Sequence, residues 1–236
     1  MNIRILFDNR KRDKGYFAGW GVSYLIDGHI LFDAGENEDM LFHNMRSMGV
    51  KPEEITKIVV SHEHWDHVGG LWRLLAHNPG MPAYICPGVS IEFKDKIVSF
   101  GADITFVEPF MEIDRNVFTT GETIGITRYG MIPEQALVLR SEKGATVITG
   151  CAHNGIVDIL ASVREKIPEP IYLVLGGFHT LDLPPSVVRL MIKRFREMDV
   201  ARVAPTHCTG MEAIQLFREA YGSDFVEAVV GTNLEV

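Results

Sequence analysis

The sequence predicts an α/β fold in which two mixed β-sheets pack face to face with helices on both outer faces, a four-layered αβ/βα sandwich. The first observation is that predicted strands and helices alternate along most of the chain. The second is that the C-terminal half repeats the strand-then-helix order of the N-terminal half without repeating its sequence. The third is that the 236 residues are 46% apolar and that no linker or repeat divides them. We therefore expect a single domain over residues 1–236.

The N-terminal half is predicted to be strand-rich at its start. Asp27-Gly28 predicts a hairpin turn, and Gly49 is expected to end an amphipathic helix. Leu71, Leu74 and Leu75 recur at helical spacing and predict a further helix. Strands are expected at residues 3–8, 22–26, 30–32, 58–60, 83–86 and 104–107. Helices are expected at residues 39–48, 68–77 and 91–100.

The C-terminal half alternates strands with helices. Pro184-Pro185 stand at the start of one predicted helix, where proline is well tolerated. Val187, Leu190 and Met191 then follow at helical spacing. Strands are expected at residues 136–139, 146–149, 171–175, 203–204 and 225–230. Helices are expected at residues 156–167, 186–198 and 211–221.

Four side chains that can bind a metal lie within six residues: His62, His64, Asp66 and His67. They follow the predicted strand at 58–60, in a strand-to-helix loop where their side chains can converge. Imidazole suits zinc, iron or copper, and a carboxylate adds an oxygen ligand that can hold a second ion. A lone histidine is usually a surface or core residue, but that explanation does not cover four such groups in one turn. The segment therefore predicts a metal site.

Four ligands on one loop cannot satisfy two ions, so further ligands must come from the C-terminal half. The candidates that come directly after predicted strands are Cys151, His153, His179 and His207. Because they leave their strands in the same sense as residues 62–67, we expect them at the same rim of the fold. The other three histidines, expected to be surface residues, are His29, His43 and His77.

The segment His62-x-His64-x-Asp66-His67 after a buried strand resembles the signature of the metallo-β-lactamase superfamily. The resemblance implies the αβ/βα sandwich fold, with His62 and His64 on one metal and Asp66 and His67 on the other. Flavodiiron oxygen reductases carry a glutamate at the second histidine position. His64 at that position favours a hydrolytic dizinc-like site over a diiron redox site.

The resemblance further implies that His153 completes the first metal and that His207 completes the second. The chain departs from the common pattern because the usual Gly-His-Thr histidine is absent and Cys151 replaces the bridging aspartate. A thiolate can bind zinc, but cysteine is also a common small buried residue. Cys151 is therefore either a ligand or part of the packing.

Two further residues have expected roles beside the metals. His179 follows Gly176-Gly177, and we expect it to donate to an anionic substrate or a developing oxyanion. Its alternatives are a metal ligand and a purely structural histidine. Asp33 matches a recurrent early aspartate of the superfamily, and we expect it to accept the second N–H of a metal-bound imidazole.

The motifs at residues 150–155, 176–179 and 207–210 resemble a subgroup that includes the dihydropterin–ribofuranosylaminobenzene 5′-phosphate synthases. The expected function is a metal-dependent hydrolase that uses a metal-bound hydroxide, oriented by Asp66, at a mono- or dinuclear site. We expect one or two divalent ions, zinc in the first place and manganese or iron otherwise. The expected substrate is a small anionic molecule, phosphorylated or pterin-like. The alternatives are a synthase-like transferase of that subgroup and an iron-binding redox or sensor protein.

Charge and composition exclude other classes of protein. The net charge of −8 argues against broad nucleic-acid binding, which depends on neutralising phosphates. No apolar run approaches the roughly 18 residues of a membrane span. The three cysteines, with no secretory signal pattern at the start of the sequence, predict a cytoplasmic protein.

Overall fold

The structure, a computed structural model, describes residues 1–127 and 130–236. Its internal contacts divide it into two compact units. Unit 1 comprises residues 1–108 and 229–235, and unit 2 comprises residues 109–228 and 236. The single domain expected over residues 1–236 stays a prediction. Within the described ranges, every helix is too short or too polar to cross a membrane.

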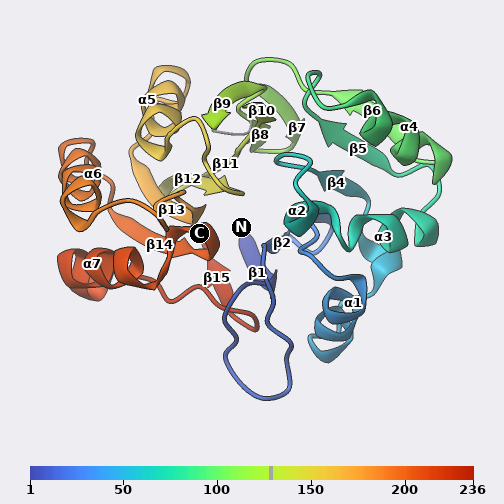
Figure 1. The fold of residues 1–236 in the computed structure, drawn as a ribbon, viewed down its shortest axis with the longest axis horizontal. Coiled ribbons are helices and arrows are strands. Elements are labelled where there is room, and N and C mark those ends of the chain that lie inside the picture. Colours follow the sequence, from blue (N-terminus) through green and yellow to red (C-terminus); the bar gives the residue numbers. More distant parts are fainter. Residues whose placement is uncertain (128–129) are drawn as a thin grey trace. The chain divides into compact units, whose positions relative to one another are not determined.

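Unit 1 is built on a seven-stranded mixed sheet with the order β15-β1-β2-β3-β4-β5-β6 (Figure 1). Neighbours from β15 to β3 pair antiparallel, and neighbours from β3 to β6 pair parallel. The strands are β1 (Asn2–Phe7), β2 (Ser23–Ile26), β3 (Ile30–Phe32), β4 (Lys57–Val59), β5 (Pro82–Ile85), β6 (Asp103–Phe106) and β15 (Asn233–Glu235). The helices are α1 (Glu38–Ser47), α2 (Trp65–Val68), α3 (Leu71–His77) and α4 (Ile91–Ser99), with a 3-10 turn at Pro52–Glu54.

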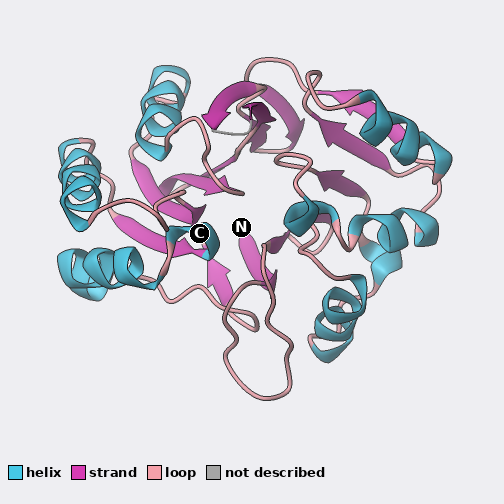
Figure 2. Ribbon diagram, in the orientation of Figure 1, coloured by secondary structure: helices cyan, strands magenta, loops and turns pink. Residues whose placement is uncertain are grey.

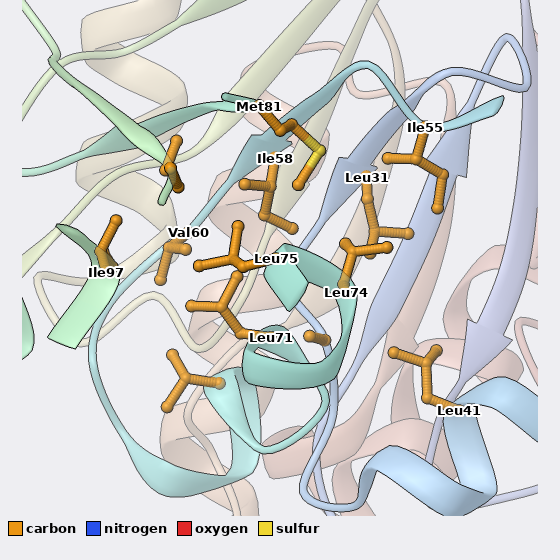
Figure 3. Packing of buried hydrophobic residues seen from close by; sticks show 14 of the residues in the cluster. Leu31, Leu41, Ile55, Ile58, Val60, Leu71, Leu74, Leu75, Met81 and Ile97 are labelled. Atoms are coloured by element: carbon orange, nitrogen blue, oxygen red, sulfur yellow. The ribbon is translucent and has the colours of Figure 1, made fainter. Parts of the chain in front are cut away.

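Helices α1, α3 and α4 pack against this sheet through one apolar cluster (Figure 3). Leu74 of α3 and Ile97 of α4 pack in this cluster with Leu31 of β3 and Ile58 of β4. All four side chains are fully buried, and each such burial contributes about 1.5–3 kcal/mol. The cluster therefore holds β4 firmly, and β4 leads directly into the predicted metal-binding segment.

Unit 2 is built on a six-stranded mixed sheet with the order β14-β13-β12-β11-β8-β7, flanked by helices (Figure 2). Strands β12, β13 and β14 run parallel, whereas β11, β8 and β7 pair antiparallel. The strands are β7 (Met111–Asp114), β8 (Val117–Thr119), β11 (Leu137–Ser141), β12 (Gly144–Thr149), β13 (Ile171–Gly177) and β14 (Arg202–Thr206). A separate antiparallel pair consists of β9 (Thr123–Thr127) and β10 (Gly130–Glu134). The helices are α5 (Ile156–Lys166), α6 (Pro185–Glu197) and α7 (Met211–Tyr221), with 3-10 turns at His207–Thr209 and Gly222–Asp224.

Three aromatic rings anchor the loop that follows β13. Phe178 comes directly after β13, and its ring centroid lies 5.6 Å from that of Phe195 on α6 and 5.3 Å from that of Phe217 on α7. Phe195 and Phe217 are 5.4 Å apart. All three rings are buried, and such edge and tilted pairs add about 0.5–1.5 kcal/mol each. The next residue is His179, so this packing fixes the start of a candidate site loop.

The predicted α/β class with mixed sheets and flanking helices is confirmed, but three predicted details are wrong. The expected strand at residues 225–230 forms only isolated bridges at Phe225 and Val230, and the last strand is β15 instead. Four strands, β7 to β10, lie where none was expected.

The third wrong detail is the helix expected at residues 68–77, which is two helices, α2 and α3. A Cβ on Gly69 would lie 2.0 Å from the carbonyl oxygen of Glu36, and one on Gly70 would lie 2.6 Å from that of Ala34. The helical path breaks at this close approach of two backbones, which only glycine allows. As a result, Asp66 and His67 lie on α2 rather than in an open loop.

Candidate metal centre

The first cluster consists of His62, His64, Asp66 and His67, all in unit 1. The Nε2 atom of His62 lies 3.0 Å from the Nδ1 atom of His64. The Nε2 atom of His67 lies 3.5 Å from Oδ2 of Asp66, and the His62 and His67 ring centroids are 4.2 Å apart. The structure therefore brings together the four residues of the predicted signature.

The donor atoms of the first cluster suit a metal ion. Two nitrogens bound to one tetrahedral zinc ion at about 2.0–2.1 Å lie about 3.3 Å apart, close to the observed separation of His62 and His64. His62 and His67 are fully buried and Asp66 is 6% exposed. A buried carboxylate among imidazoles is favourable when a cation balances its charge. Imidazole and carboxylate are both ligands that zinc, manganese and iron accept.

Asp33 supports the first cluster through hydrogen bonds with Ser61 and His67. Its Oδ1 accepts the backbone N–H of Ser61 at 2.7 Å, and its Oδ2 accepts the Ser61 hydroxyl and Nδ1–H of His67, each at 2.7 Å. Because the Ser61 hydroxyl donates its hydrogen bond to Asp33, its oxygen accepts from Nδ1–H of His62 at 2.8 Å. Both histidines then carry their proton on Nδ1 and present an unprotonated Nε2. Asp33 makes the kind of contact that was predicted for it.

The electrostatics of Asp33 depend on these partners. Burial raises the pKa of the Asp33 carboxyl above its ordinary value, whereas His67 and Ser61 act in the opposite direction. Asp33 also has a left-handed backbone with φ of 57°. Aspartate tolerates that conformation better than most residues, so this residue suits both the backbone and the hydrogen bonds at position 33.

The second cluster lies in unit 2 at the carboxyl ends of the parallel strands β12, β13 and β14. Its members are Cys151, His153, His179, His207 and Cys208. The donor atoms of Cys151, His153 and His179 lie within 4.8 Å of one another, and so do those of Cys151, His207 and Cys208. His179 is exposed, whereas Cys151, His207 and Cys208 are buried. The structure thus gathers all four C-terminal candidates and adds Cys208.

Two residues of the second cluster, and Ala152 between two of its members, have strained backbones. Ala152, His179 and His207 have φ values of 62°, 52° and 51°. Non-glycine residues in this conformation cost of order 1 kcal/mol or more each, and they concentrate at functional sites. The strain turns the chain sharply after each strand, which keeps the side chains at the edge of the sheet.

Cys208 was not recognised from the sequence. Its thiol lies 3.6 Å from the carbonyl oxygen of Cys151. A Cβ on Gly177 would lie 2.5 Å from its sulfur, so glycine is required there. Burial opposes the thiolate, but the hydrogen bond with Cys151 and the charge of His207 and His179 hold the pKa of Cys208 well below its ordinary value. The hydrogen bond with Cys208 in turn raises the pKa of His179.

Glu134, at the end of β10, was also missed. It is 1% exposed, and its carboxylate accepts hydrogen bonds from the loop at residues 151–153. A charged residue at the entry to the predicted strand 136–139 was the available signal, since such a residue is rarely buried unless it is paired.

The model of the metallo-beta-lactamase superfamily matches residues 19–207. Because this match covers most of the chain, the protein belongs to the metallo-β-lactamase superfamily. The matched range includes the first cluster, and it ends at His207 in the second.

Relatives extend the likeness over nearly the whole chain. The 7,8-dihydropterin-6-methyl-4-(β-D-ribofuranosyl)-aminobenzene-5′-phosphate synthase of Methanocaldococcus jannaschii is 26% identical, with 89% of this chain and 87% of the relative covered. An uncharacterised protein of the same organism is 31% identical over 93% of this chain and 96% of its own length. The crystal structure of Tm1679, described as a metal-dependent hydrolase of the β-lactamase superfamily, has a TM-score of 0.85 and 29% identity over 100% of this chain and 99% of that one. The predicted fold and the superfamily resemblance are therefore confirmed.

Proposed function

We propose that the protein is a metal-dependent hydrolase acting on a small anionic substrate. The proposed ligands of one or two divalent ions, zinc in the first place, are His62, His64, Asp66, His67, Cys151, His153 and His207. The observation that carries the proposal is the first cluster, where the Asp33–Ser61 pair leaves Nε2 of His62 and His67 unprotonated. Divalent ions bound there supply Lewis acidity that activates water and polarises a carbonyl or phosphoryl oxygen.

The protein's own side chains have separate proposed roles. Asp66 accepts hydrogen bonds and orients the attacking water, since its carboxylate lies beside His67. His179 is the exposed imidazole of the second cluster, and its raised pKa favours the protonated form. A protonated imidazole can donate to an anionic substrate or to a developing negative charge. We propose that donor role for His179.

A synthase-like transferase is the second candidate function. It is favoured by the likeness to the dihydropterin-ribofuranosylaminobenzene-phosphate synthase. Unit 1 also offers a site for a flat ring. Trp65, between two residues of the first cluster, is 61% exposed and lines an open groove of about 550 Å³ with Trp72 and Lys96. An aromatic face of this kind stacks well on a flat heterocycle. The cytoplasmic location expected from the sequence remains part of the proposal.

A substrate panel tests the proposal. The metal-loaded full chain is assayed on phosphodiesters, lactones, thioesters and pterin precursors, beside His64→Ala and the control His29→Ala. His29 is a half-buried residue outside the first cluster, and its Nδ1 contacts the carbonyl oxygen of Asp27. We expect hydrolysis of at least one ester class that His64→Ala loses and His29→Ala keeps. Activity confined to pterin precursors would replace the hydrolase with the transferase. Hydrolysis that His64→Ala retains in full would contradict both.

A further inference from the structure

The buried carboxylate of Glu134 accepts hydrogen bonds from four N–H groups. Its Oε1 accepts the backbone N–H groups of Cys151 and Ala152 at 3.0 and 2.9 Å. Its Oε2 accepts the backbone N–H of His153 at 2.6 Å and Nδ1–H of the same residue at 3.0 Å. Three consecutive amides that point to one place form a concave anion site. Here the anion is a side chain of the same chain.

The backbone after β12 requires such a partner. Ala152 has a left-handed φ of 62°, and its amide and the two that flank it all donate to Glu134. Buried N–H groups without an acceptor would destabilise the fold. Each oxygen of the Glu134 carboxylate faces two of these N–H groups. Glu134 is therefore an acceptor on both oxygens.

This contact decides which nitrogen of His153 carries the proton. A carboxylate can only accept, so Nδ1 of His153 must donate, and the lone pair of the imidazole lies on Nε2. The His153 side chain is 3% exposed and has little freedom to turn away. An imidazole held in this way is a ready ligand with a defined direction.

The β9–β10 pair adds a steric constraint on the same residue. Glu134 is the last residue of β10, and Gly125 lies on the paired strand β9. A Cβ on Gly125 would lie 2.4 Å from Cβ of His153 and 2.9 Å from its carbonyl carbon. The backbone of β9 thus packs directly on His153, while β10 supplies its hydrogen-bond acceptor. Two independent contacts from one strand pair fix the same side chain.

We propose that Glu134 is a positioning residue that fixes His153 as the Nδ1–H tautomer and directs its Nε2 to a divalent ion. The inference rests on the proposed function in one respect, namely that His153 is a ligand.

The substitution Glu134→Gln tests the role with little change in volume. If the oxygen of the introduced glutamine side chain keeps accepting from the backbone N–H groups of Cys151 and Ala152, its NH₂ group faces Nδ1 of His153. Nδ1 of His153 must then accept, and its proton moves to Nε2, which can no longer bind a metal. Glu169→Gln is the matched control, because it makes the same charge change in unit 2 on a carboxylate that pairs with Arg140.

Two measurements on the full chain distinguish positioning from simple stabilisation. ¹⁵N NMR of the metal-free protein, with the His153 signals assigned from His153→Ala, should show the Nδ1–H tautomer in the wild type and the Nε2–H tautomer in Glu134→Gln. Zinc and cobalt titrations should show about 10–100-fold weaker binding in Glu134→Gln and unchanged binding in Glu169→Gln. A wild-type His153 protonated on Nε2 would overturn the proposal without any variant, as would wild-type metal affinity in a folded Glu134→Gln.

A double-mutant comparison separates this inference from the proposed function. If Glu134 acts through His153, adding Glu134→Gln to His153→Ala should weaken metal binding no further. A further tenfold loss would show that Glu134 acts by another route and would overturn the proposal. If His153→Ala alone leaves metal binding unchanged, His153 is not a ligand and the proposed ligand set is wrong. In that case, ¹⁵N NMR still shows whether Glu134 determines the tautomer of His153.

Discussion

Oδ2 of Asp33 and Nδ1 of His67 lie 2.7 Å apart, and both side chains are fully buried. Asp33 also holds Ser61, which contacts His62, so one carboxylate sets the protonation of two histidines of the first cluster. The arrangement parallels that of Glu134 and His153 in unit 2. In each unit a buried acid from an earlier strand or turn supports the imidazoles that follow a later strand.

Asp33→Asn should weaken metal binding more than it weakens the fold. Asparagine tolerates the left-handed backbone at this position, but an NH₂ group in place of Oδ2 could accept from neither the Ser61 hydroxyl nor Nδ1–H of His67. We expect about 10–100-fold lower metal affinity, measured by titration of the full chain with zinc, and a melting temperature that falls by a few degrees at most.

Asp27→Asn is the control for this substitution. Asp27 also has a left-handed backbone, with φ of 45°, but its carboxylate accepts from the backbone N–H of Asn2. Metal affinity should stay at the wild-type level in Asp27→Asn. Equal losses in the two variants would show that Asp33 acts through the backbone alone.

Cys151→Ser should lower metal occupancy well before it lowers stability. Serine nearly preserves the volume of cysteine but is a far weaker ligand for zinc. Cys151→Asp should restore occupancy, because it returns the bridging carboxylate common in the superfamily. Metal content and melting temperature are measured on both variants, with Cys86→Ser as a buried thiol control in unit 1.

The opposite result, a destabilising Cys151→Asp and a mild Cys151→Ser, would show that Cys151 is a packing residue and not a metal ligand. Its side chain is 4% exposed, so an aspartate that meets no cation there would be an unpaired buried charge and would destabilise the fold. In that case Cys151→Ser would keep its metal and Cys151→Asp would unfold at a lower temperature.

We expect ionisation of Tyr221 to lower the stability of the folded protein at alkaline pH. Its side chain is buried and its hydroxyl has no hydrogen-bond partner within residues 1–127 and 130–236. Burial raises the pKa of Tyr221 to about 12, although Arg196, 3.8 Å from the ring centroid, acts against it. The folded state therefore keeps its proton at pH values where the unfolded tyrosine loses it. This stabilisation is fully present below about pH 10 and is lost as the pH rises toward 12, amounting to about 2–3 kcal/mol.

Tyr221→Phe should remove that alkaline loss. No hydrogen bond is lost with this hydroxyl, so the free energy of unfolding at neutral pH should change by less than about 1 kcal/mol. Urea unfolding at about pH 8 and about pH 11 measures both effects. Tyr172→Phe is the comparison, since that hydroxyl accepts from Arg202. An equal alkaline loss in the wild type and Tyr221→Phe would contradict the assignment.

The sequence predicted those parts of the fold whose signals are local. The strand before residue 61 and the helix at Pro185–Glu197 carry apolar periodicity and turn residues of their own. β9 and β10 do not, because their exposed residues include apolar Ile126 and Met131, and pairing alone makes them strands. β15 is a polar strand that exists because β1 offers an open edge.

The difference between local and long-range signals also explains which residues of the candidate site could be predicted. His62, His64, Asp66 and His67 are close in sequence, so their pattern was readable. Glu134 lies 17 to 19 residues from the N–H groups that it accepts. Its partners become neighbours only when β10 pairs with β9 and the loop after β12 turns at Ala152. No local pattern records such a contact, and a lone glutamate in a sequence usually lies on the surface.

The metal content of the full chain tests the central claim most directly. Protein expressed with ample zinc, manganese and iron is purified, and its metal is determined by elemental analysis beside His64→Ala and His29→Ala. We predict one to two transition-metal ions per chain in the wild type and His29→Ala, and a loss of most first-site metal in His64→Ala with the fold retained. An absorption spectrum of bound iron with reversible reduction would favour a redox protein. Wild-type chain that carries no transition metal would contradict the account.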